Sequence, residues 1–189
     1  MRRLAVILLS LVLALPAQSA TVAGVTLPDS FPMGGQNLVL NGIGVRTVTF
    51  LAVKAYVAGL YLPQRSSDAR SILSSPGTKV LMMQFLHSAS KSQVEAQYRD
   101  GEKKNCGHGE CNKADETDFE RLVAATPGAE VGDTLTYIYG PKGVRALFNN
   151  RQIADIANPD LARQLLAGFI GAAPPSEDLR QHLLGAKTN

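Results

Sequence analysis

The sequence is poor in aromatic residues and in charge of one sign. It has no tryptophan, and aromatic residues make up only 6% of the chain, which leaves little material for a surface on which nucleic-acid bases stack. Basic residues number 19 and acidic residues 16; without Arg2 and Arg3, which lie in the N-terminal segment, 17 basic residues face 16 acidic ones, a net charge of +1. This balance does not supply the basic field that phosphate binding needs, so nucleic acid is not an expected partner.

Sequence motifs of the common hydrolases and nucleotide-dependent enzymes are also missing. No GxSxG, HExxH, P-loop or dinucleotide-binding fingerprint occurs. His87 follows a predicted strand and His182 lies among leucines of a predicted helix, and neither has an evident serine or cysteine nucleophile arranged with it. The sequence therefore favours neither class of enzyme, and no cofactor is expected.

Hydrophobic runs long enough to cross a membrane are missing from the chain after its N-terminal segment. There, Arg2 and Arg3 precede an apolar run over residues 4–15 that is too short to span a bilayer stably, and residues 17–19 (AQS) offer small side chains for cleavage. This pattern predicts a signal peptide over residues 1–20, with an uncleaved N-terminal anchor as the alternative. We therefore expect a protein exported to the periplasm, with residues 21–189 forming one domain and no membrane span.

The chain has only two cysteines, Cys106 and Cys111, and they flank Gly-His-Gly-Glu. Two cysteines, His108 and Glu110 within six positions suggest a metal site, but their spacing is not that of a zinc finger or ribbon. In an exported protein two neighbouring cysteines more often form a disulfide. The sequence therefore predicts a Cys106–Cys111 disulfide and no metal site.

Residues 38–62 (LVLNGIGVRTVTFLAVKAYVAGLYL) form the longest apolar run of the predicted domain, and a charged residue, Arg46, lies within it. Side chains alternate with the period of a β-strand on both sides of a break near Leu51 and Ala52. The β-branched and aromatic content favours two strands over one long helix. A guanidinium buried in this hairpin needs a partner or a ligand, whereas an Arg46 on the solvent face needs neither.

The rest of the chain shows strand patterns, then helix patterns, then strands and helices again. This order predicts an α+β fold in which an antiparallel sheet carries helices on one face. Serine, asparagine, glycine and proline mark the ends of the elements. The predicted strands are 22–27, the two of the hairpin, 79–86, 133–139, 143–148 and 151–154. The first two predicted helices run from a cap at Ser66 or Ser67 through Leu73 and over residues 90–104. The third begins at a cap at Asn112 and buries Phe119, Leu122 and Val123, the fourth begins at Asn158 with Leu161, Leu165, Phe169 and Ile170 facing inward, and the fifth begins at a cap at Ser176.

Two parts of the sequence resemble the bacterial chalcone isomerase-like domain. The first is LNGIGVRT followed by KAYVAGLYLPQ, and the second is GPKGVRALFNN followed by FIGAAPPSEDLRQHLLG near the C-terminus. The resemblance covers about residues 21–185 and rests on hydrophobic and glycine-based motifs. It implies an open-faced β-sandwich with a ligand cleft between the sheet and the helical layer.

The resemblance also implies roles for particular residues. Arg46 matches the arginine that contacts the substrate oxyanion in plant chalcone isomerases and holds the lipid carboxylate in the fatty-acid-binding members. Tyr56 falls where the family has its catalytic threonine, and a tyrosine places its hydroxyl further from the backbone. Tyr98 and Asn105 lie in the region of the family's helical tyrosine and asparagine; we take Tyr98 as a candidate ligand contact and assign neither residue a catalytic role.

Three functions remain open at this point. The sequence has the family's arginine, at Arg46, but a tyrosine at the position of the catalytic threonine. The resemblance therefore favours a non-catalytic protein that binds a small apolar acid, such as a fatty acid, through Arg46, Tyr56 and Tyr98. The first alternative is a cofactor-free intramolecular lyase or isomerase that acts on a chalcone-like phenolic enone, for which Arg46 and Tyr56 are the candidate catalytic residues. The second is a structural or partner-binding domain whose cleft is filled by its own side chains.

Overall fold

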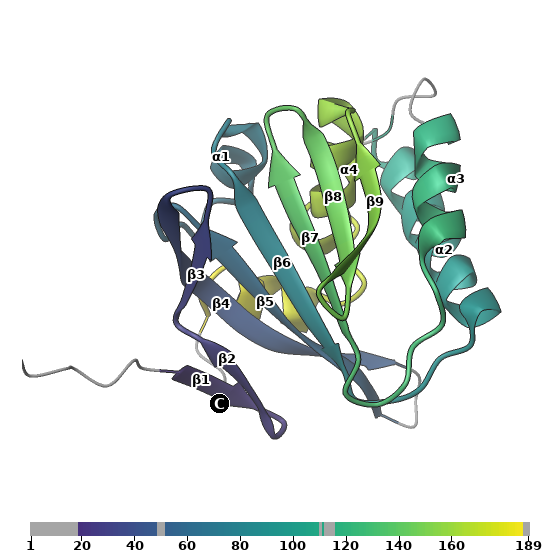
Figure 1. The fold of residues 1–189 in the computed structure, drawn as a ribbon, viewed down its shortest axis with the longest axis horizontal. Helices are drawn as coiled ribbons and strands as arrows, with labels where there is room; N and C mark the ends of the chain where they lie inside the picture. The colour runs from purple at the N-terminus through teal and green to yellow at the C-terminus, as the bar shows by residue number, and fades with distance from the viewer. Residues whose placement is uncertain (1–18, 49–51, 110, 112–115, 187–189) are drawn as a thin grey trace, which may run out of the picture.

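The computed structural model describes residues 19–48, 52–109, 111 and 116–186. Their fold is α+β, as the sequence predicts: a seven-stranded antiparallel sheet has the order β3-β4-β5-β6-β7-β8-β9, and β1 and β2 form a separate two-stranded sheet (Figure 1). The strands are β1 Ser19–Val22, β2 Val25–Pro28, β3 Ser30–Met33, β4 Gln36–Val48, β5 Val53–Leu62, β6 Lys79–Phe85, β7 Thr134–Gly140, β8 Gly143–Phe148 and β9 Arg151–Ile156. The helices are α1 Ala69–Ser74, α2 Lys91–Gly107, α3 Glu116–Ala125, α4 Pro159–Ile170 and α5 Glu177–Leu183.

The helices pack against one face of the large sheet. Figure 1 is viewed from the other face, so that α4 and α5 lie behind the strands, while α2 and α3 lie side by side beyond β9. Buried side chains such as Leu60, Leu81, Leu122 and Ile170 fill the space between the sheet and the helices. No helix among the described residues is long and apolar enough to cross a membrane.

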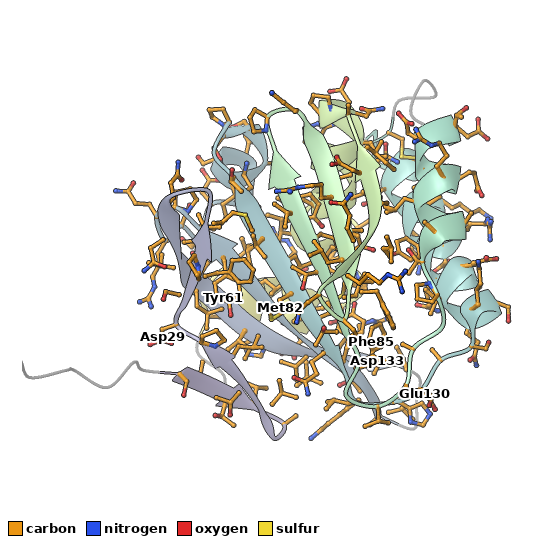
Figure 2. All side chains as sticks on the ribbon, viewed as in Figure 1. Asp29, Tyr61, Met82, Phe85, Glu130 and Asp133 are labelled. Atoms are coloured by element: carbon orange, nitrogen blue, oxygen red, sulfur yellow. A yellow bond between two sulfur atoms is a disulfide. The ribbon has the colours of Figure 1, made fainter. Side chains whose placement is uncertain are left out.

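The opposite face of the sheet carries a second cluster of buried side chains, beneath β1, β2 and β3. Tyr61 lies at its centre, and its hydroxyl donates a hydrogen bond to the carbonyl of Pro28 at 3.0 Å (Figure 2). The ring of Phe31 packs against the ring of Tyr61, with centroids 5.5 Å apart. The alternating side chains of β5 therefore serve two separate cores, one on each face of the sheet.

Tight turns join most of the strands where the sequence predicts them. Asn149 and Asn150 connect β8 to β9 with φ values of 48° and 62°, which asparagine tolerates better than most residues. The segment 22–27 departs from the prediction of a single strand: Ala23 and Gly24 have φ values of 49° and 80° and turn the chain between β1 and β2. β1 begins at Ser19, inside the segment predicted as a signal peptide, and residues 1–18 lie outside the described residues.

Two helix boundaries differ from the prediction. α1 is capped by Asp68 rather than by Ser66 or Ser67, because the Asp68 carboxylate accepts hydrogen bonds from the backbone amides of Arg70 and Ser71. α2 begins where the helix over 90–104 was predicted, with Ser90 as its cap, but it continues to Gly107, through residues expected to form a loop. The predicted cap of α3, Asn112, lies outside the described residues.

The other helices agree with the sequence analysis. Asn158 and Ser176 cap α4 and α5, each accepting a hydrogen bond from a backbone amide three residues on. The residues predicted to face inward are buried in α3 and α4, except that Phe169 is half-buried.

Two glycines of β4 bring α5 against the sheet. A Cβ at Gly44 would lie 2.7 Å from the Cβ of His182, and a Cβ at Gly42 would meet the backbone carbonyls of His182 and Leu183. Only residues without a side chain fit this close approach between a helix and a strand. Gly42 and Gly44 thus mark the helix-facing side of β4, and Arg46 is the next residue on that side.

Candidate functional site

Arg46 and Tyr56 are directly opposite each other in the ladder between β4 and β5. Opposite residues of an antiparallel pair point to the same face of the sheet, and Tyr56 packs against the cluster under the helices. Both side chains are half-buried. The ladder shifts its register between Arg46 and Thr47, and Nη1 of Arg46 donates a hydrogen bond to the carbonyl oxygen of Thr47 at 2.7 Å. The sheet therefore holds a guanidinium beside a phenol at the edge of the helix-facing core.

The Arg46–Tyr56 pair has the electrostatics of a site for an anion. Burial raises the pKa of Tyr56 from its usual 10.0 to about 12, and the charge of Arg46 offsets part of that rise. The phenol is therefore neutral at pH 7 and remains a hydrogen-bond donor. Within the described part of the chain, no carboxylate forms an ion pair with Arg46. A cation and a neutral donor thus lie side by side, and no carboxylate of the described residues neutralises the cation.

Tyr98 of α2 extends this group from the helical layer. Its hydroxyl lies 3.4 Å from Oγ1 of Thr126, and its ring makes an edge contact with Phe119, with centroids 6.4 Å apart. Burial raises the pKa of Tyr98, the hydrogen bond with Thr126 offsets part of that rise, and the phenol of Tyr56 adds to it. The structure thus brings the three candidate residues together around one end of the space between sheet and helices; their ligand contacts stay a prediction.

The cleft expected in this space lies where the described residues form the main core. Side chains of the main core occupy it, and the ring of Phe85 makes an edge contact with Tyr56 at 6.1 Å between centroids. A hollow of about 620 Å³ lies elsewhere, between α1, α4 and α5. It is a surface feature bordered by Arg70, Arg163 and Arg180. The sequence could not distinguish an open cleft from a filled one, because the side chains that fill it come from distant parts of the chain.

Four buried polar residues near this core were not identified as site residues from the sequence. Asn105, Tyr137, Tyr139 and Gln164 each carry a side-chain N or O atom without a hydrogen-bond partner among the described residues. Two sequence patterns could have identified them. Tyr137 and Tyr139 alternate along one strand, so they point to the same face of the sheet, and Tyr98 and Asn105 are seven residues apart, which places both on one face of a helix. That spacing had no meaning while Asn105 was expected in a loop.

The two cysteines form the predicted disulfide. Cys106 in the last turn of α2 is bonded to Cys111, with their Cα atoms 4.7 Å apart. Among the described residues, no group of His, Cys, Asp and Glu side chains is arranged to hold a metal ion. The bond is local and closes the end of α2 directly after the buried Asn105.

Comparisons with known proteins point to one family. The sequence matches the family described as chalcone isomerase-like over residues 19–185. The fold is similar to the crystal structure of a fatty-acid binding protein of Arabidopsis thaliana, with a TM-score of 0.71 and 14% sequence identity over 89% of this chain and 96% of the plant chain. No relative was found among curated proteins.

Proposed function

The chain belongs to the chalcone isomerase-like family, and we propose from this premise that it binds a small apolar acid, such as a fatty acid, without transforming it. The acid lies between the sheet and the helices, with its carboxylate at Arg46. The observation that carries the proposal is the pairing of Arg46 with the neutral phenol of Tyr56, where no carboxylate of the described residues forms an ion pair with Arg46. The fatty-acid binding protein of similar fold supports the same class of ligand.

The chemistry of this pair suits a carboxylate. A guanidinium offers a planar set of N–H donors that matches the two oxygens of a carboxylate, and a phenol can add a further hydrogen bond. Such a ligand supplies the negative charge that the described side chains do not supply to Arg46. It also places its apolar part against residues behind Tyr56 such as the half-buried Phe85 and the buried Met83.

Room for the apolar part is provided by a displacement of α2. This helix has 17 residues, yet Asn105 is the only fully buried one. Its outer contacts are polar: Arg99 pairs with Glu120 of α3 at 2.9 Å, and the Lys91 ammonium donates to the carbonyl of Ala124 at 2.8 Å. Exposed contacts of this kind stabilise weakly, so α2 moves at lower cost than the apolar α4.

The experiment compares a fatty acid with the alcohol of the same chain length. We expect Arg46→Ala to weaken binding of dodecanoate roughly ten- to a hundredfold, because a buried charge-assisted contact contributes about 1.5 to 3 kcal/mol. Binding of dodecanol should hardly change. Arg145→Ala is the matched control, since Arg145 is exposed on β8 and alternates with residues of the helix-facing core. Equal losses for acid and alcohol would mean that Arg46 shapes the pocket and does not bind charge.

A second candidate function follows from the filled core. In this alternative the domain binds no small molecule and serves as a structural or partner-binding unit, which the tight packing around Leu60, Leu81 and Leu122 favours. The same titration separates the two functions: dodecanoate that fails to bind the wild-type protein at any ratio supports the structural unit.

We also propose that the protein acts outside the cytoplasm, in the periplasm. The proposal rests on the basic and apolar pattern of residues 2–15 and on the two cysteines, which suit an oxidising compartment. Mass spectrometry of the protein recovered from the periplasmic fraction tests it: a mature N-terminus near residue 20 is expected, and recovery of the full-length chain in the cytoplasm would contradict it.

A further inference from the structure

Five buried side-chain atoms have no hydrogen-bond partner among the described residues: Nδ1 of His182, which lies in α5 beside Gly44, and four atoms that belong to residues of α2, α4 and β7. These four are the side-chain oxygens of Asn105 and Gln164 and the hydroxyls of Tyr137 and Tyr139, and each of these residues is at most 4% exposed. Buried polar groups in folded proteins nearly always have a partner, in the protein, in ordered water or in a ligand. Four such atoms in one part of a core therefore require an explanation.

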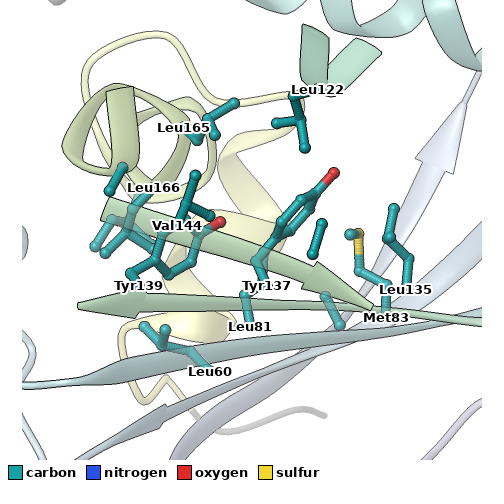
Figure 3. Close-up of a cluster of buried hydrophobic side chains, with 14 of the residues drawn as sticks. Leu60, Leu81, Met83, Leu122, Leu135, Tyr137, Tyr139, Val144, Leu165 and Leu166 are labelled. Carbon is teal, nitrogen blue, oxygen red and sulfur yellow. The ribbon is translucent and has the colours of Figure 1, made fainter. Parts of the chain in front are cut away.

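The four side chains come from three neighbouring elements, since α2 contacts α4 and α4 contacts β7. Tyr137 and Tyr139 point from β7 toward the helices, with ring centroids 5.9 Å apart, and Figure 3 shows the hydroxyl of Tyr137 directed toward Leu122. Nδ2 of Asn105 lies 3.1 Å from the point where a Cβ of Gly168 would be, so the end of α2 packs on α4. Gln164 precedes Gly168 by one turn of α4. We call these four residues the deep polar cluster.

The deep polar cluster is connected with the Arg46 end of the core. Burial raises the pKa of Tyr139 well above its usual value, and the phenols of Tyr98 and Tyr56 raise it further. On β5, Leu60 comes four residues after Tyr56. Leu60 pairs with Leu81 of β6, and Leu81 pairs with Tyr137 of β7. Tyr137 is therefore displaced from Tyr56 by four residues along the strand direction, about 13 Å, and by two strands across the sheet, about 10 Å. A medium-length acid held at Arg46 reaches this distance.

The chemistry of the cluster defines what the far end of the ligand carries. The two amide oxygens only accept hydrogen bonds, whereas the two phenols donate and accept. A hydroxyl group satisfies both kinds, since it donates to an amide oxygen and accepts from a phenol. A methyl group at the same place leaves all four atoms unpaired, which disfavours a plain alkyl chain.

We propose that the ligand is a hydroxy acid, whose carboxylate binds Arg46 and whose distant hydroxyl binds the deep polar cluster. This inference rests on the proposed function, because it assumes an acid anchored at Arg46. It assigns specificity to residues of β7 and α4 that lie away from the Arg46–Tyr56 pair.

The test compares dodecanoate with ω-hydroxydodecanoate by calorimetry on the full-length chain and on variants. We expect the wild-type protein to bind the hydroxy acid roughly tenfold more tightly, the ratio expected for one added buried hydrogen bond. Tyr137→Phe and Gln164→Met should each reduce that ratio toward one, because each removes a hydrogen-bonding partner of the hydroxyl and a polar atom that disfavours the methyl end of dodecanoate. Tyr61→Phe is the matched control, since its hydroxyl lies in the core of the opposite face, and the ratio should stay as in the wild type.

The outcomes separate this inference from the proposed function. If both acids bind with equal affinity and depend on Arg46, the proposed function stands and the inference is overturned, with ordered water as the partner of the four atoms. A preference for the hydroxy acid that survives in the Tyr137→Phe, Gln164→Met double variant also overturns it. If neither acid shows binding that depends on Arg46, the proposed function itself fails, and this inference fails with it.

Discussion

The Cβ of His182 in α5 lies 2.7 Å from the position that a Cβ on Gly44 of β4 would take. No ordinary pair of side chains approaches this closely, so the helix rests on the backbone of the strand. The contact fixes the helix-facing side of β4, and Arg46, two residues further on, projects on that side. The contact between Gly44 and α5 thus fixes the side of the sheet to which Arg46 points.

The first prediction follows from this contact. We expect Gly44→Ala to lower the free energy of unfolding by about 1 to 3 kcal/mol, because an added methyl group forces α5 away from the sheet. Urea denaturation measures the change. Gly101→Ala is the control: Gly101 lies within α2, where a Cβ meets nothing within 4 Å, and alanine should stabilise the helix by up to about 1 kcal/mol. A Gly44→Ala protein as stable as the wild type would contradict the packing described here.

A second prediction concerns the disulfide between Cys106 and Cys111. Reduction should lower the free energy of unfolding by roughly 2 kcal/mol on the chain-entropy estimate for so short a loop. The Cys106→Ser, Cys111→Ser double variant should have the same stability as the reduced wild type, and it should not change on adding reductant. Thiol titration of the purified protein under denaturing, non-reducing conditions should find no free cysteine. Two free thiols would show that the bond does not form.

The third prediction is a loss of stability at alkaline pH that depends on Tyr56. Its pKa in the folded protein is about 12, against a usual 10.0, because burial disfavours the phenolate. As the pH rises, the Tyr56 phenol therefore loses its proton in the unfolded chain before it does so in the folded protein. The contribution of Tyr56 to the free energy of unfolding is fully present below pH 10 and is lost as the pH rises toward 12. Denaturation across this range should show a shallower decline in Tyr56→Phe than in the wild type. The same decline of stability with pH in both proteins would show that the Tyr56 phenol is exposed to solvent.

Much of the fold was predictable because its signals are local. Residues 38–48 and 53–62 form strands as their alternation predicts, and Asn158 and Ser176 cap helices as their positions suggest. The turn at Ala23 was missed because alanine rarely adopts a positive φ, and the extension of α2 was missed because glycine and asparagine usually end helices.

The candidate site was less predictable because it depends on packing between distant segments. The sequence identified Arg46 and Tyr56, and their pairing follows from the register of β4 and β5. Which core side chains lie behind them, and that Tyr137 and Gln164 carry polar atoms without a partner among the described residues, depends on how β7 and α4 meet. No local pattern in either segment encodes that contact.

A fourth prediction is that the wild-type protein does not cyclise chalcones appreciably. That reaction needs a cation for the attacking phenolate, a positioned donor for the ketone, and room to hold the substrate near its cyclised shape. Arg46 supplies the cation, but the ring of Tyr56 packs against Phe85 where substrate would lie. Loss of one positioned donor alone typically costs on the order of a hundredfold in rate.

The assay follows the visible absorbance of tetrahydroxychalcone with and without protein. We expect the two rates to agree, and Tyr56→Thr to open space without restoring activity. A wild-type rate well above the protein-free control that disappears in Arg46→Ala would establish an isomerase in place of a binding protein.

Native mass spectrometry of the freshly purified protein tests the central claim, that Arg46 anchors an apolar acid, most directly. The wild-type protein should carry a bound acid, or retain added dodecanoate at one equivalent, while Arg46→Ala purified in parallel should carry none and Arg145→Ala should match the wild type. A wild-type protein that stays free of acid even after dodecanoate is added, or an acid retained equally by Arg46→Ala, would contradict the account.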